Sequence, residues 1–595
     1  MQEHLVPPAV PSTTTGNLAD LPFRNAARRP DHVVAARPVD GQWEDVTAAR
    51  FADDVAALAR GLIAAGIQPG ERVGLMSKTR YEWTLADFAI WAAGGVVVPI
   101  YETSSAEQVR WILADSEAVA VILETPHHEA VVAEVRSELA GLRSVWQIDG
   151  GAIADLAASG SSVSQEDLET RRAVSDRATV ATIIYTSGTT GRPKGCELTH
   201  GNLRDLAENT TARLAGIVAA PEASTLLFLP LAHVFARFIE VLCIESGAKL
   251  AHSSDLKNLL GDLASYQPTF VLAVPRVFEK IYNSSEQKAT AGGKGAIFAA
   301  ATATAIAYSE ALDTGSVGLV LRIKHLIFDR LVFGKIRAAM GGKVQWAVSG
   351  GAPLGTRLGH YFRGVGVTIL EGYGLTETTA PATVNTPELA KIGTVGPPLP
   401  GVGIRIADDG EILIKGINVF RGYHNNPEAS SAAFSDGWFC TGDIGELDSE
   451  GYLKITGRKK EILVTAGGKN VAPAVLEDAL RAHPLVSQCV VVGDGKPFVG
   501  ALITLDAEMW PGWAANAGVD VPLEKAKTDP TVLAALQSAV DTANRSVSKA
   551  ESIRKFAVLD GDFTEENGYL TPSLKLRRNV VMRDFADEVE ALYGG

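Results

Sequence analysis

The sequence predicts an α/β protein in which helices cover a largely parallel sheet, followed by a smaller α+β unit at the C-terminal end. Three observations lead to this prediction. In the part of the chain before Tyr185, apolar stretches with helical spacing alternate with short β-branched runs, a pattern typical of parallel sheets. From Gly410 on, the chain changes to short strands and turns. At 595 residues it is also too long for one core, which favours two or more domains.

The elements of the first part follow from apolar spacing and from the residues at their ends. Residues 51–65 have helical spacing and end at Gly66, which suits a helix C-cap. Ser104 with Glu107 has the spacing of a capping box that opens a further helix. The Ser- and charge-rich residues 159–177 predict a surface connection. Strands are expected at the β-branched runs 72–76, 96–100, 118–123 and 180–184.

Composition excludes some classes of function. The chain is 46% hydrophobic and 21% charged, as in ordinary globular proteins, and its formal net charge of −14 argues against a general nucleic-acid binder. Four cysteines without metal-ligand spacing suit a reducing compartment, and the N-terminus lacks the features of a secretory signal, so a cytoplasmic location is expected. The apolar run 88–101 is short for a membrane span and is interpreted as a helix end, a turn and a buried strand.

Residues 292–342 are Ala-rich and then mix large apolar residues with Arg and Lys. This composition allows two interpretations. The segment could form an amphipathic surface near a membrane, or its basic residues could lie on the solvated side of packed helices. The second interpretation is preferred, and peripheral membrane contact stays open. The basic residues concerned are Arg322, Lys324, Arg330 and Lys335.

The stretch Tyr185–Gly195 has the composition of a phosphate-binding loop. It follows a run that predicts a buried strand, so the loop is expected at a strand end, where α/β proteins place ligands. Glycines let the backbone approach an anion, hydroxyls donate hydrogen bonds, and a lysine adds positive charge. An ordinary polar turn is the alternative. Gly195 follows the lysine, so the loop is not a Walker A motif. The candidate phosphate ligands are Thr186, Ser187, Gly188, Thr189, Thr190, Gly191 and Lys194.

A second candidate loop, Glu371–Thr378, follows the apolar run 367–370. Tyr373 could stack on a flat ring, whereas Thr376 and Glu377 could serve phosphate and metal. The alternative is a turn with a solvated glutamate.

Three further positions carry candidate chemistry. Asp443 is expected just after a strand, where its carboxylate could accept two sugar hydroxyls. His233 lies between apolar neighbours, where a structural histidine is the alternative to a catalytic one. Lys575 precedes Arg577 and Arg578, so the alternative to a catalytic lysine is a basic chain end that is simply exposed to solvent.

Taken together, these motifs resemble the adenylate-forming (AMP-binding) superfamily in order and spacing, and in particular its long-chain fatty acyl-CoA synthetase branch as found in actinobacterial long-chain acyl-CoA ligases. The resemblance covers nearly the whole chain after about the first 20 residues. The stretches that carry it are Tyr185–Gly195, Val274–Phe278, Ser349–Leu354, Glu371–Thr378, Trp438–Asp443, Gly457–Glu461 and Lys575.

The resemblance implies a large N-terminal domain of layered α/β sheets (αβαβα), residues 1–456, and a small mobile α+β C-terminal domain, residues 457–595. It implies that a fatty carboxylate attacks the α-phosphate of ATP with Mg²⁺, giving acyl-AMP and pyrophosphate. The thiol of coenzyme A then attacks the acyl carbon and releases AMP. The expected ligands are therefore a long-chain fatty acid, ATP, Mg²⁺ and CoA. The oligomeric state stays open between monomer and homodimer.

Roles for single residues also follow from the resemblance. The first loop would hold the β- and γ-phosphates, and Thr189 with Glu377 would place Mg²⁺. Thr376 would contact the α-phosphate, and Lys575 would bridge the carboxylate and the α-phosphate. His233 would lie near the acyl carboxylate. The adenine would be flanked by Gly351, Ala352 and Tyr373, and the ribose would be held by Asp443 and Arg458. The loop residues Glu371, Gly372 and Gly374 would also belong to the cofactor-binding site.

The resemblance places a hinge at Lys460, about which the small domain would rotate between the two half-reactions. Gly467 and Gly468 would then face the pantetheine channel of CoA, although a simple turn is the alternative. Relatives often carry a lysine where this chain has Val464, so a phosphate contact there is not expected.

Three rival functions are considered. A ligase that hands acyl-AMP to a carrier protein would carry an insertion near the hinge, and none is obvious. A ligase for aryl, short-chain or amino acids is another rival, but no aspartate for an amino group can be placed. A non-catalytic nucleotide- or lipid-binding protein is disfavoured, because Lys575, Glu377 and the first loop are all present.

Overall fold

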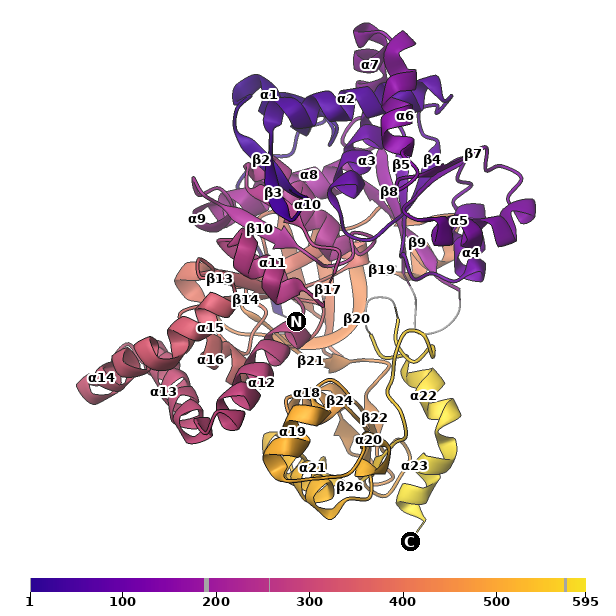
Figure 1. The fold of residues 1–595 in the computed structure, drawn as a ribbon. Coiled ribbons are helices and arrows are strands. Elements are labelled where there is room, and N and C mark those ends of the chain that lie inside the picture. The colour runs from indigo at the N-terminus through magenta and orange to yellow at the C-terminus, as the bar shows by residue number, and fades with distance from the viewer. Residues whose placement is uncertain (1, 187–191, 256, 572–574, 595) are drawn as a thin grey trace.

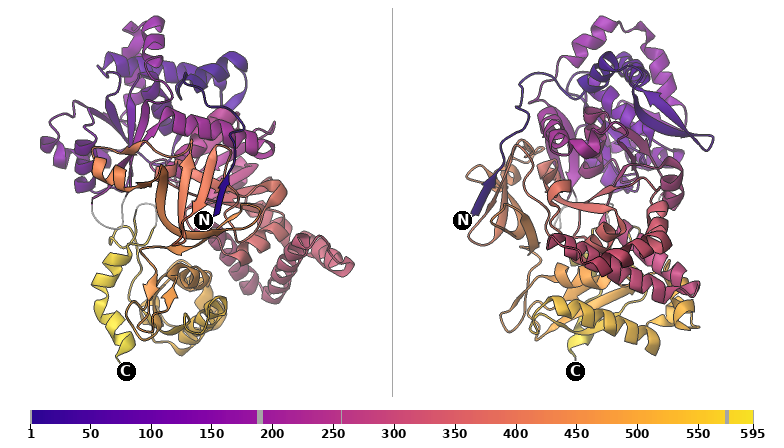
Figure 2. Two further views of the ribbon diagram at one scale, coloured as in Figure 1. Left: turned by 180° about the vertical axis from the view of Figure 1, so that it is seen from behind. Right: turned by 90° about the vertical axis from the view of Figure 1, so that its left-hand side faces the viewer.

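The computed structural model describes residues 2–186, 192–255, 257–571 and 575–594. Figure 1 shows a large body formed by the chain up to about β21, and a smaller body below it that contains the C-terminus. Figure 2 shows the same two parts from behind and from the side. The α/β prediction is confirmed, because parallel strands and covering helices make up most of the large body.

A seven-stranded sheet carries the first candidate loop. Strands β4, β5, β6, β7 and β8 pair in parallel, while β9 and β18 add to its edge in antiparallel fashion. The spatial order is β18 (Gly422–Tyr423), β9 (Lys194–Thr199), β8 (Val180–Thr186), β5 (Val96–Ile100), β4 (Arg72–Met76), β6 (Ala120–Leu123) and β7 (Ser144–Gln147). The strands expected at 72–76 and 96–100 have the predicted bounds.

Two four-stranded sheets carry the other candidate residues of the large body. In each, a parallel core ends in one antiparallel strand. The first has the order β10 (Ser224–Leu227), β11 (Lys249–His252), β2 (Val33–Val39) and β3 (Gln42–Thr47). The second has the order β12 (Phe270–Ala273), β13 (Trp346–Ser349), β14 (Thr368–Leu375) and β15 (Ala380–Val384).

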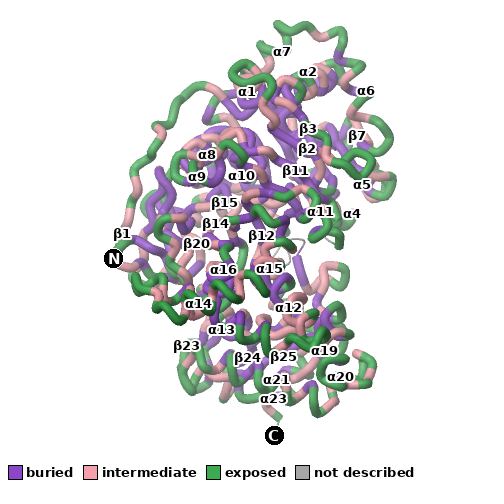
Figure 3. Tube along the Cα trace, turned by 60° about the vertical axis from the view of Figure 1, so that its left-hand side comes forward, coloured by how far each residue is buried: buried purple, intermediate pink, exposed green. Residues whose placement is uncertain are grey.

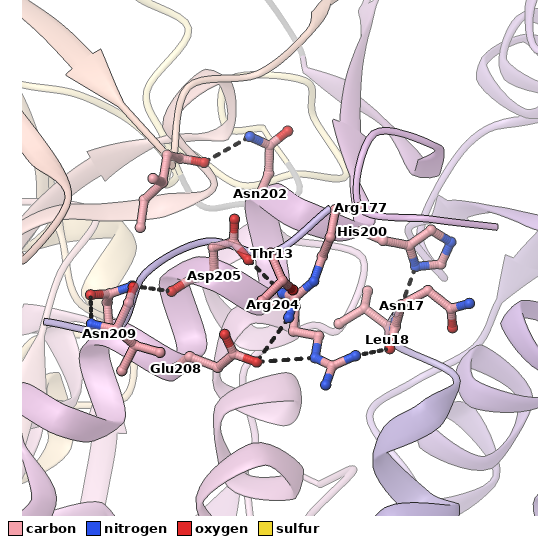
Figure 4. Close-up of polar contacts among 12 residues, drawn as sticks. Thr13, Asn17, Leu18, Arg177, His200, Asn202, Arg204, Asp205, Glu208 and Asn209 are labelled. Carbon is pink, nitrogen blue, oxygen red and sulfur yellow. Dashed lines mark hydrogen bonds and ion pairs between the residues drawn. The ribbon is translucent and has the colours of Figure 1, made fainter. Parts of the chain in front are cut away.

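An antiparallel sheet includes the very first strand of the chain, because β1 pairs with β16, far along the sequence. Its strands are β1 (Gln2–Leu5), β16 (Val402–Ile406), β17 (Glu411–Gly416), β20 (Trp438–Leu447), β19 (Phe434–Ser435) and β21 (Leu453–Arg458). After β1 the chain runs along helix α8 (His200–Arg213), where Asn209 Oδ1 accepts from the N–H groups of Ala9 and Val10 at 2.8 and 3.0 Å. Figure 4 shows Asn209 and the neighbouring Arg177–Asp205 ion pair.

The core of the large body is held by helices packed on these sheets. All but one of the residues of α3 (Tyr81–Ala92) are buried, and the buried Arg237 of α10 (Val234–Ser246) pairs with Asp87 of α3 at 2.6 Å. This ion pair fixes α10, whose first turn borders the site. The other helices of this body are α1 (Asp20–Arg28), α2 (Ala48–Ala64), α4 (Ala106–Asp115), α5 (Pro126–Val135), α6 (Ala152–Ser159), α7 (Gln165–Arg172), α9 (Ala215–Val218), α11 (Leu259–Tyr266), α12 (Pro275–Ala291), α13 (Gly295–Asp313), α14 (Leu319–Phe328), α15 (Gly334–Ala339), α16 (Thr356–Val365) and α17 (Pro427–Ala432).

The smaller body has its own apolar core, formed where helices pack on a three-stranded sheet. The three-stranded sheet consists of β24 (Val486–Val492), β25 (Val499–Leu505) and β26 (Ile553–Val558). A separate pair of strands is formed by β22 (Leu463–Val464) and β23 (Asn470–Val471). Its helices are α18 (Pro473–Arg481), α19 (Trp510–Ala517), α20 (Leu523–Ala526), α21 (Pro530–Ala543), α22 (Arg578–Asp584) and α23 (Ala586–Tyr593).

Three local predictions were wrong. The capping box of α4 is formed by Ser105 and Gln108, one residue later than expected, because the helix begins at Ala106. Residues 159–177 are not only a surface connection, since they contain α7, which has its own capping box. Asp443 lies within β20 rather than just after a strand.

Candidate active site

The first loop joins the paired ends of β8 and β9. Thr186 faces Lys194 across the antiparallel ladder, so both lie where the sheet ends. The Lys194 ammonium lies 4.1 Å from the centre of the Tyr423 ring, a cation–π distance. The predictions for Ser187, Gly188, Thr189, Thr190 and Gly191 lie outside the described residues.

Glu377 is held by Tyr423, a residue that sequence analysis missed. The Tyr423 hydroxyl donates to Glu377 Oε1 at 2.9 Å, and the Phe420 N–H donates to the Glu377 carbonyl at 2.9 Å. Tyr423 therefore links the lysine of the first loop to the carboxylate of the second. Nothing in the local sequence Gly422-Tyr423 marks this role, because β18 reaches the site only through pairing with β9.

The backbone of the second loop is tightly bent. Thr379 and Ala380 both have left-handed φ angles, +56° and +72°, which non-glycine residues rarely adopt. A Cβ on Gly374 would lie 1.5 Å from the Ala380 carbonyl oxygen, so only glycine fits there. The Thr379 hydroxyl donates to the Asn418 carbonyl at 2.7 Å and anchors the bend. Backbone strain of this kind persists only where surrounding contacts maintain it. The anchored bend therefore fixes the position of Thr376 and Glu377, which precede it in the sequence.

Asp443 joins the two parts of the site. Its Oδ2 accepts from the Tyr373 hydroxyl at 2.6 Å, and its Oδ1 accepts from Arg458 Nε at 2.8 Å. Burial, and then the Asp443 charge, raise the pKa of Tyr373 well above its usual value, so the phenol keeps its proton. A carboxylate has about four acceptor positions, so two remain for further donors.

The Gly351–Ala352 turn lies beside the second loop. Gly351 has a φ of +84°, and a Cβ there would lie 3.8 Å from Val274. Glu371 Oε2 accepts from the Leu354 N–H at 3.2 Å and so ties this turn to β14. A Cβ on Gly372 would lie 3.0 Å from the Thr383 carbonyl, which leaves the loop little room for side chains.

His233 is the N-cap of α10. Its Nδ1 accepts from the Phe235 N–H at 3.2 Å, so the proton of the neutral ring is on Nε2. Burial, and then the positive charge of Lys575, lower its pKa to about 3. The histidine is therefore neutral and can donate one hydrogen bond from Nε2.

Lys575 lies with the residues of the large body. The charges of Arg458, Asp443, Glu377 and Glu461 all act on the pKa of its ammonium. Part of the side chain reaches solvent, but the surrounding protein displaces much of its water, and this desolvation followed by the Arg458 charge lowers its pKa. The Lys575 N–H donates to the Thr571 hydroxyl at 3.1 Å, which holds the backbone in place.

The remaining predicted residues lie in two exposed turns. Lys460 is exposed in the turn that follows β21, where the Glu461 and Ile462 N–H groups both donate to the Arg458 carbonyl. Gly467 and Gly468 are exposed in the hairpin between β22 and β23, and Gly468 has a φ of +76°.

The donor set suits Mg²⁺ that arrives with a nucleotide. Among the described residues no group of three or more His, Cys, Asp or Glu side chains could hold a metal ion. Mg²⁺ is commonly bound by one or two carboxylates together with substrate phosphates, and Glu377 offers such a carboxylate beside the cationic Lys194.

Fold and site together define an adenylate-forming type of enzyme. The chain belongs to the AMP-binding enzyme family, whose model matches residues 22–424, and the model of the AMP-binding enzyme C-terminal domain matches residues 460–595. It is 53% identical to the long-chain-fatty-acid–CoA ligase FadD15 of Mycobacterium bovis over the full length of both chains. It is 32% identical to long-chain-fatty-acid–CoA ligase 6 of Mus musculus, with 88% of this chain and 78% of the mouse protein covered.

Solved structures support the fold. The anthranilate CoA ligase AuaEII, solved with anthranoyl-AMP, superposes with a TM-score of 0.74 at 20% identity and covers 98% of this chain and 99% of its own. A Mycobacterium tuberculosis fatty acyl CoA synthetase has a TM-score of 0.62 at 21% identity, with 96% and 99% covered.

Glu377→Gln is expected to lower the rate of ATP–pyrophosphate exchange by about 10²-fold and to raise the Mg²⁺ concentration needed for half-maximal exchange. The amide keeps its oxygen for Tyr423 but loses the negative charge that would attract a cation. A Mg²⁺ titration of both proteins measures this. Glu388→Gln is the matched control, and an unchanged Mg²⁺ requirement in Glu377→Gln would contradict the metal role.

Proposed function

We propose that this protein is an ATP-dependent long-chain fatty acid:CoA ligase that forms acyl-AMP and then acyl-CoA. Full-length identity of 53% to a long-chain-fatty-acid–CoA ligase supports the substrate class. The observation that carries the proposal is the position of Lys575, which comes from the C-terminal body and lies near enough to Glu377, Asp443 and Arg458 for their charges to act on its pKa. A cation at this position supports the first half-reaction, in which two anions must meet.

In that half-reaction the carboxylate of the fatty acid attacks the α-phosphate, and pyrophosphate leaves. The Lys575 ammonium would bridge the two anions and offset their repulsion, while Thr376 donates to the α-phosphate. His233 would donate its Nε2 proton to the acyl carboxylate as a neutral hydrogen-bond donor, because its low pKa keeps it uncharged. Tyr373, Gly351 and Ala352 would flank adenine, and Asp443 with Arg458 would hold the ribose.

The second half-reaction needs room for CoA, and we propose that the C-terminal body rotates about Lys460 to provide it. The exposed turn after β21 can absorb the change in backbone angles. Rotation would withdraw Lys575 and bring Gly467 and Gly468 to the channel, where the absence of side chains lets pantetheine pass. A boundary near residue 457 is supported by the start of the matched C-terminal domain model at residue 460.

Contacts between the two bodies would have to break during this rotation. Arg276 Nη2 lies 2.5 Å from Asp506 Oδ2, and Lys280 Nζ lies 2.6 Å from Glu508 Oε2. The Gln287 amide donates to the Met509 carbonyl at 3.1 Å. These contacts join α12 to the segment just before α19 and would hold the C-terminal body in place for the proposed adenylation step.

Replacing both Arg276 and Lys280 by Ala is expected to slow acyl-AMP formation by about 3- to 10-fold, because partly exposed ion pairs contribute on the order of 1 kcal/mol. Thioester formation from supplied acyl-AMP should not fall. Single-turnover assays of each step measure this, with Lys288→Ala on the same helix as control. Equal loss in both steps would show that the contacts serve general stability.

The pH profile offers a test of Lys575. Because its pKa is lowered from 10.5, the ammonium loses its proton, and kcat/KM of adenylation falls, at a pH below that value. Bound phosphates raise the pKa again, so the fall in kcat should lie at higher pH. In Lys575→Arg this alkaline limb should disappear. If the alkaline fall in kcat/KM remains in Lys575→Arg, it is caused by the titration of another group.

The direct test of function is incubation with Mg²⁺, ATP, CoA and fatty acids of graded length, while acyl-AMP, AMP and acyl-CoA are followed by mass spectrometry. CoA-dependent thioester with a maximum at long chains supports the proposal. Acyl-AMP that accumulates without thioester would favour the carrier-loading ligase. Because the reaction consumes ATP and CoA, we place it in the cytoplasm.

A further inference from the structure

Helix α14 (Leu319–Phe328) lies at the tip of an arm formed with α13. Figures 1 and 2 show this arm projecting from the large body. No residue of α14 is buried, and Figure 3 marks its trace as exposed or intermediate. The preferred interpretation of this segment, packed helices with solvated basic residues, is therefore only half right.

The helix has two distinct faces. Its inner face packs on the body, where His325 donates from Nε2 to the Gly364 carbonyl at 2.6 Å and stacks on Tyr308 with ring centres 3.8 Å apart. Leu321 and Phe328 share this inner face and are half-buried. The helix is therefore fixed in one orientation, and its other face is presented outward.

The outer face is apolar. Large side chains recur at the spacing i, i+1, i+4, i+7 and i+8, which places them in one stripe of a helix. Their exposed fractions are far above those of the core: Leu319 74%, Val320 68%, Ile323 49%, Leu326 67%, Ile327 52% and, just beyond the helix, Leu331 55%. A contiguous exposed patch of this kind marks an interaction site.

Basic residues border the stripe. At about 100° per residue, Arg322 and Lys324 fall on opposite sides of it. Residues 316–343 contain six Lys or Arg and one acid, Asp329, whereas the whole chain has a formal net charge of −14. Asp329 is paired with Arg337 at 2.7 Å, so its charge is offset.

We propose that the outer face of α14 docks on an anionic lipid surface, with its apolar stripe in the interfacial region and its flanking cations at the headgroups. A second copy of the chain fits less well. A two-fold contact through this face would place basic residues against basic residues, and six side chains are few beside the roughly 20 to 30 of a stable interface.

The contact is one of docking rather than spanning. Helix α13 is the single helix in the described part of the chain whose length and apolar composition would suit a membrane span, and only 33% of that window is buried. However, α13 is packed on α16: a Cβ on Gly364 would lie 2.1 Å from the Ala305 carbonyl. Leaving the body would break this close contact.

Docking would bring the protein to the phase in which long-chain fatty acids dissolve, and this consequence rests on the proposed function. The docking itself is tested without substrate. Full-length protein is mixed with vesicles of neutral phosphatidylcholine, or of phosphatidylcholine with phosphatidylglycerol, and the bound fraction is measured by flotation at two salt concentrations.

We expect binding to the anionic vesicles that weakens with salt, and a loss of about 10-fold or more in the double variant Leu326→Glu, Ile327→Glu. The double variant Arg322→Gln, Lys324→Gln should lose only the part of vesicle binding that depends on the salt concentration. Val174→Glu, a change at an exposed apolar residue elsewhere, is the matched control and should bind as the parent does. Unchanged adenylation of octanoate, a soluble acid, shows that the variants are folded.

Absence of vesicle binding by the parent, or equal binding by Leu326→Glu, Ile327→Glu, would overturn the proposal. So would a dimeric parent that becomes monomeric in this variant, which would assign the face to a second copy. If vesicles are bound but no fatty acid is activated, docking stands and the proposed function fails.

Discussion

Lys575→Ala is expected to lower the rate of acyl-AMP formation by about 10³-fold while leaving thioester formation from supplied acyl-AMP within about 3-fold of the parent. The charges of Glu377 and Asp443 act on this ammonium, which comes from the C-terminal body. Without it, two anions must meet with less positive charge between them, a cost of about 4 kcal/mol in the transition state. Fatty-acid-dependent ATP–pyrophosphate exchange measures the first step.

The control for this prediction is Lys549→Ala, a change at an exposed lysine of the same body that should behave as the parent. The informative result is the difference between the loss in the rate of acyl-AMP formation and the loss in the rate of thioester formation. A merely structural lysine would slow both steps together, and that outcome would remove Lys575 from the adenylation chemistry. A loss confined to the second step would place the lysine on the CoA side.

Short segments of the site could be predicted because their residues are neighbours in sequence. The first loop follows a β-branched strand, and the strands at 72–76 and 96–100 depend on local patterns alone. The end of α2 was predicted to within one residue, because its C-cap is Ala65 and Gly66 follows with a φ of +90°. The second loop also follows its strand, although β14 continues to Leu375 and so includes most of the motif.

Contacts made through tertiary pairing could not be predicted. Tyr423 reaches Glu377 only because β18 pairs with β9, and no local pattern encodes that pairing. The same holds for the Tyr373 hydroxyl on Asp443, which comes from a different sheet. The exposure of α14 was missed for a related reason: the same apolar spacing describes a buried face and an unpartnered one, and only the packing of the inner face tells them apart.

Asp443→Ala is expected to raise the KM for ATP by about 10²-fold, and Asp443→Asn by less. The carboxylate is nearly fully buried, with 5% of its side chain exposed, and it accepts from both Tyr373 and Arg458. Removing it leaves the Tyr373 hydroxyl without its acceptor, whereas Arg458, whose side chain is 40% exposed, can turn to water, so unfolding should also become easier by about 1 kcal/mol. Thermal unfolding of each variant separates this stability loss from the loss in binding.

The role in ribose binding is tested with 2′,3′-dideoxy-ATP. If Asp443 accepts the ribose hydroxyls, the parent enzyme prefers ATP strongly over the dideoxy analogue, and Asp443→Asn loses most of this preference, because the weaker acceptor gains little from either hydroxyl. Asp448→Asn, which changes an acid just beyond the end of β20, should keep the parent's preference. A preference retained in Asp443→Asn would mean that the carboxylate only positions Tyr373 and Arg458, and that the ribose is held elsewhere.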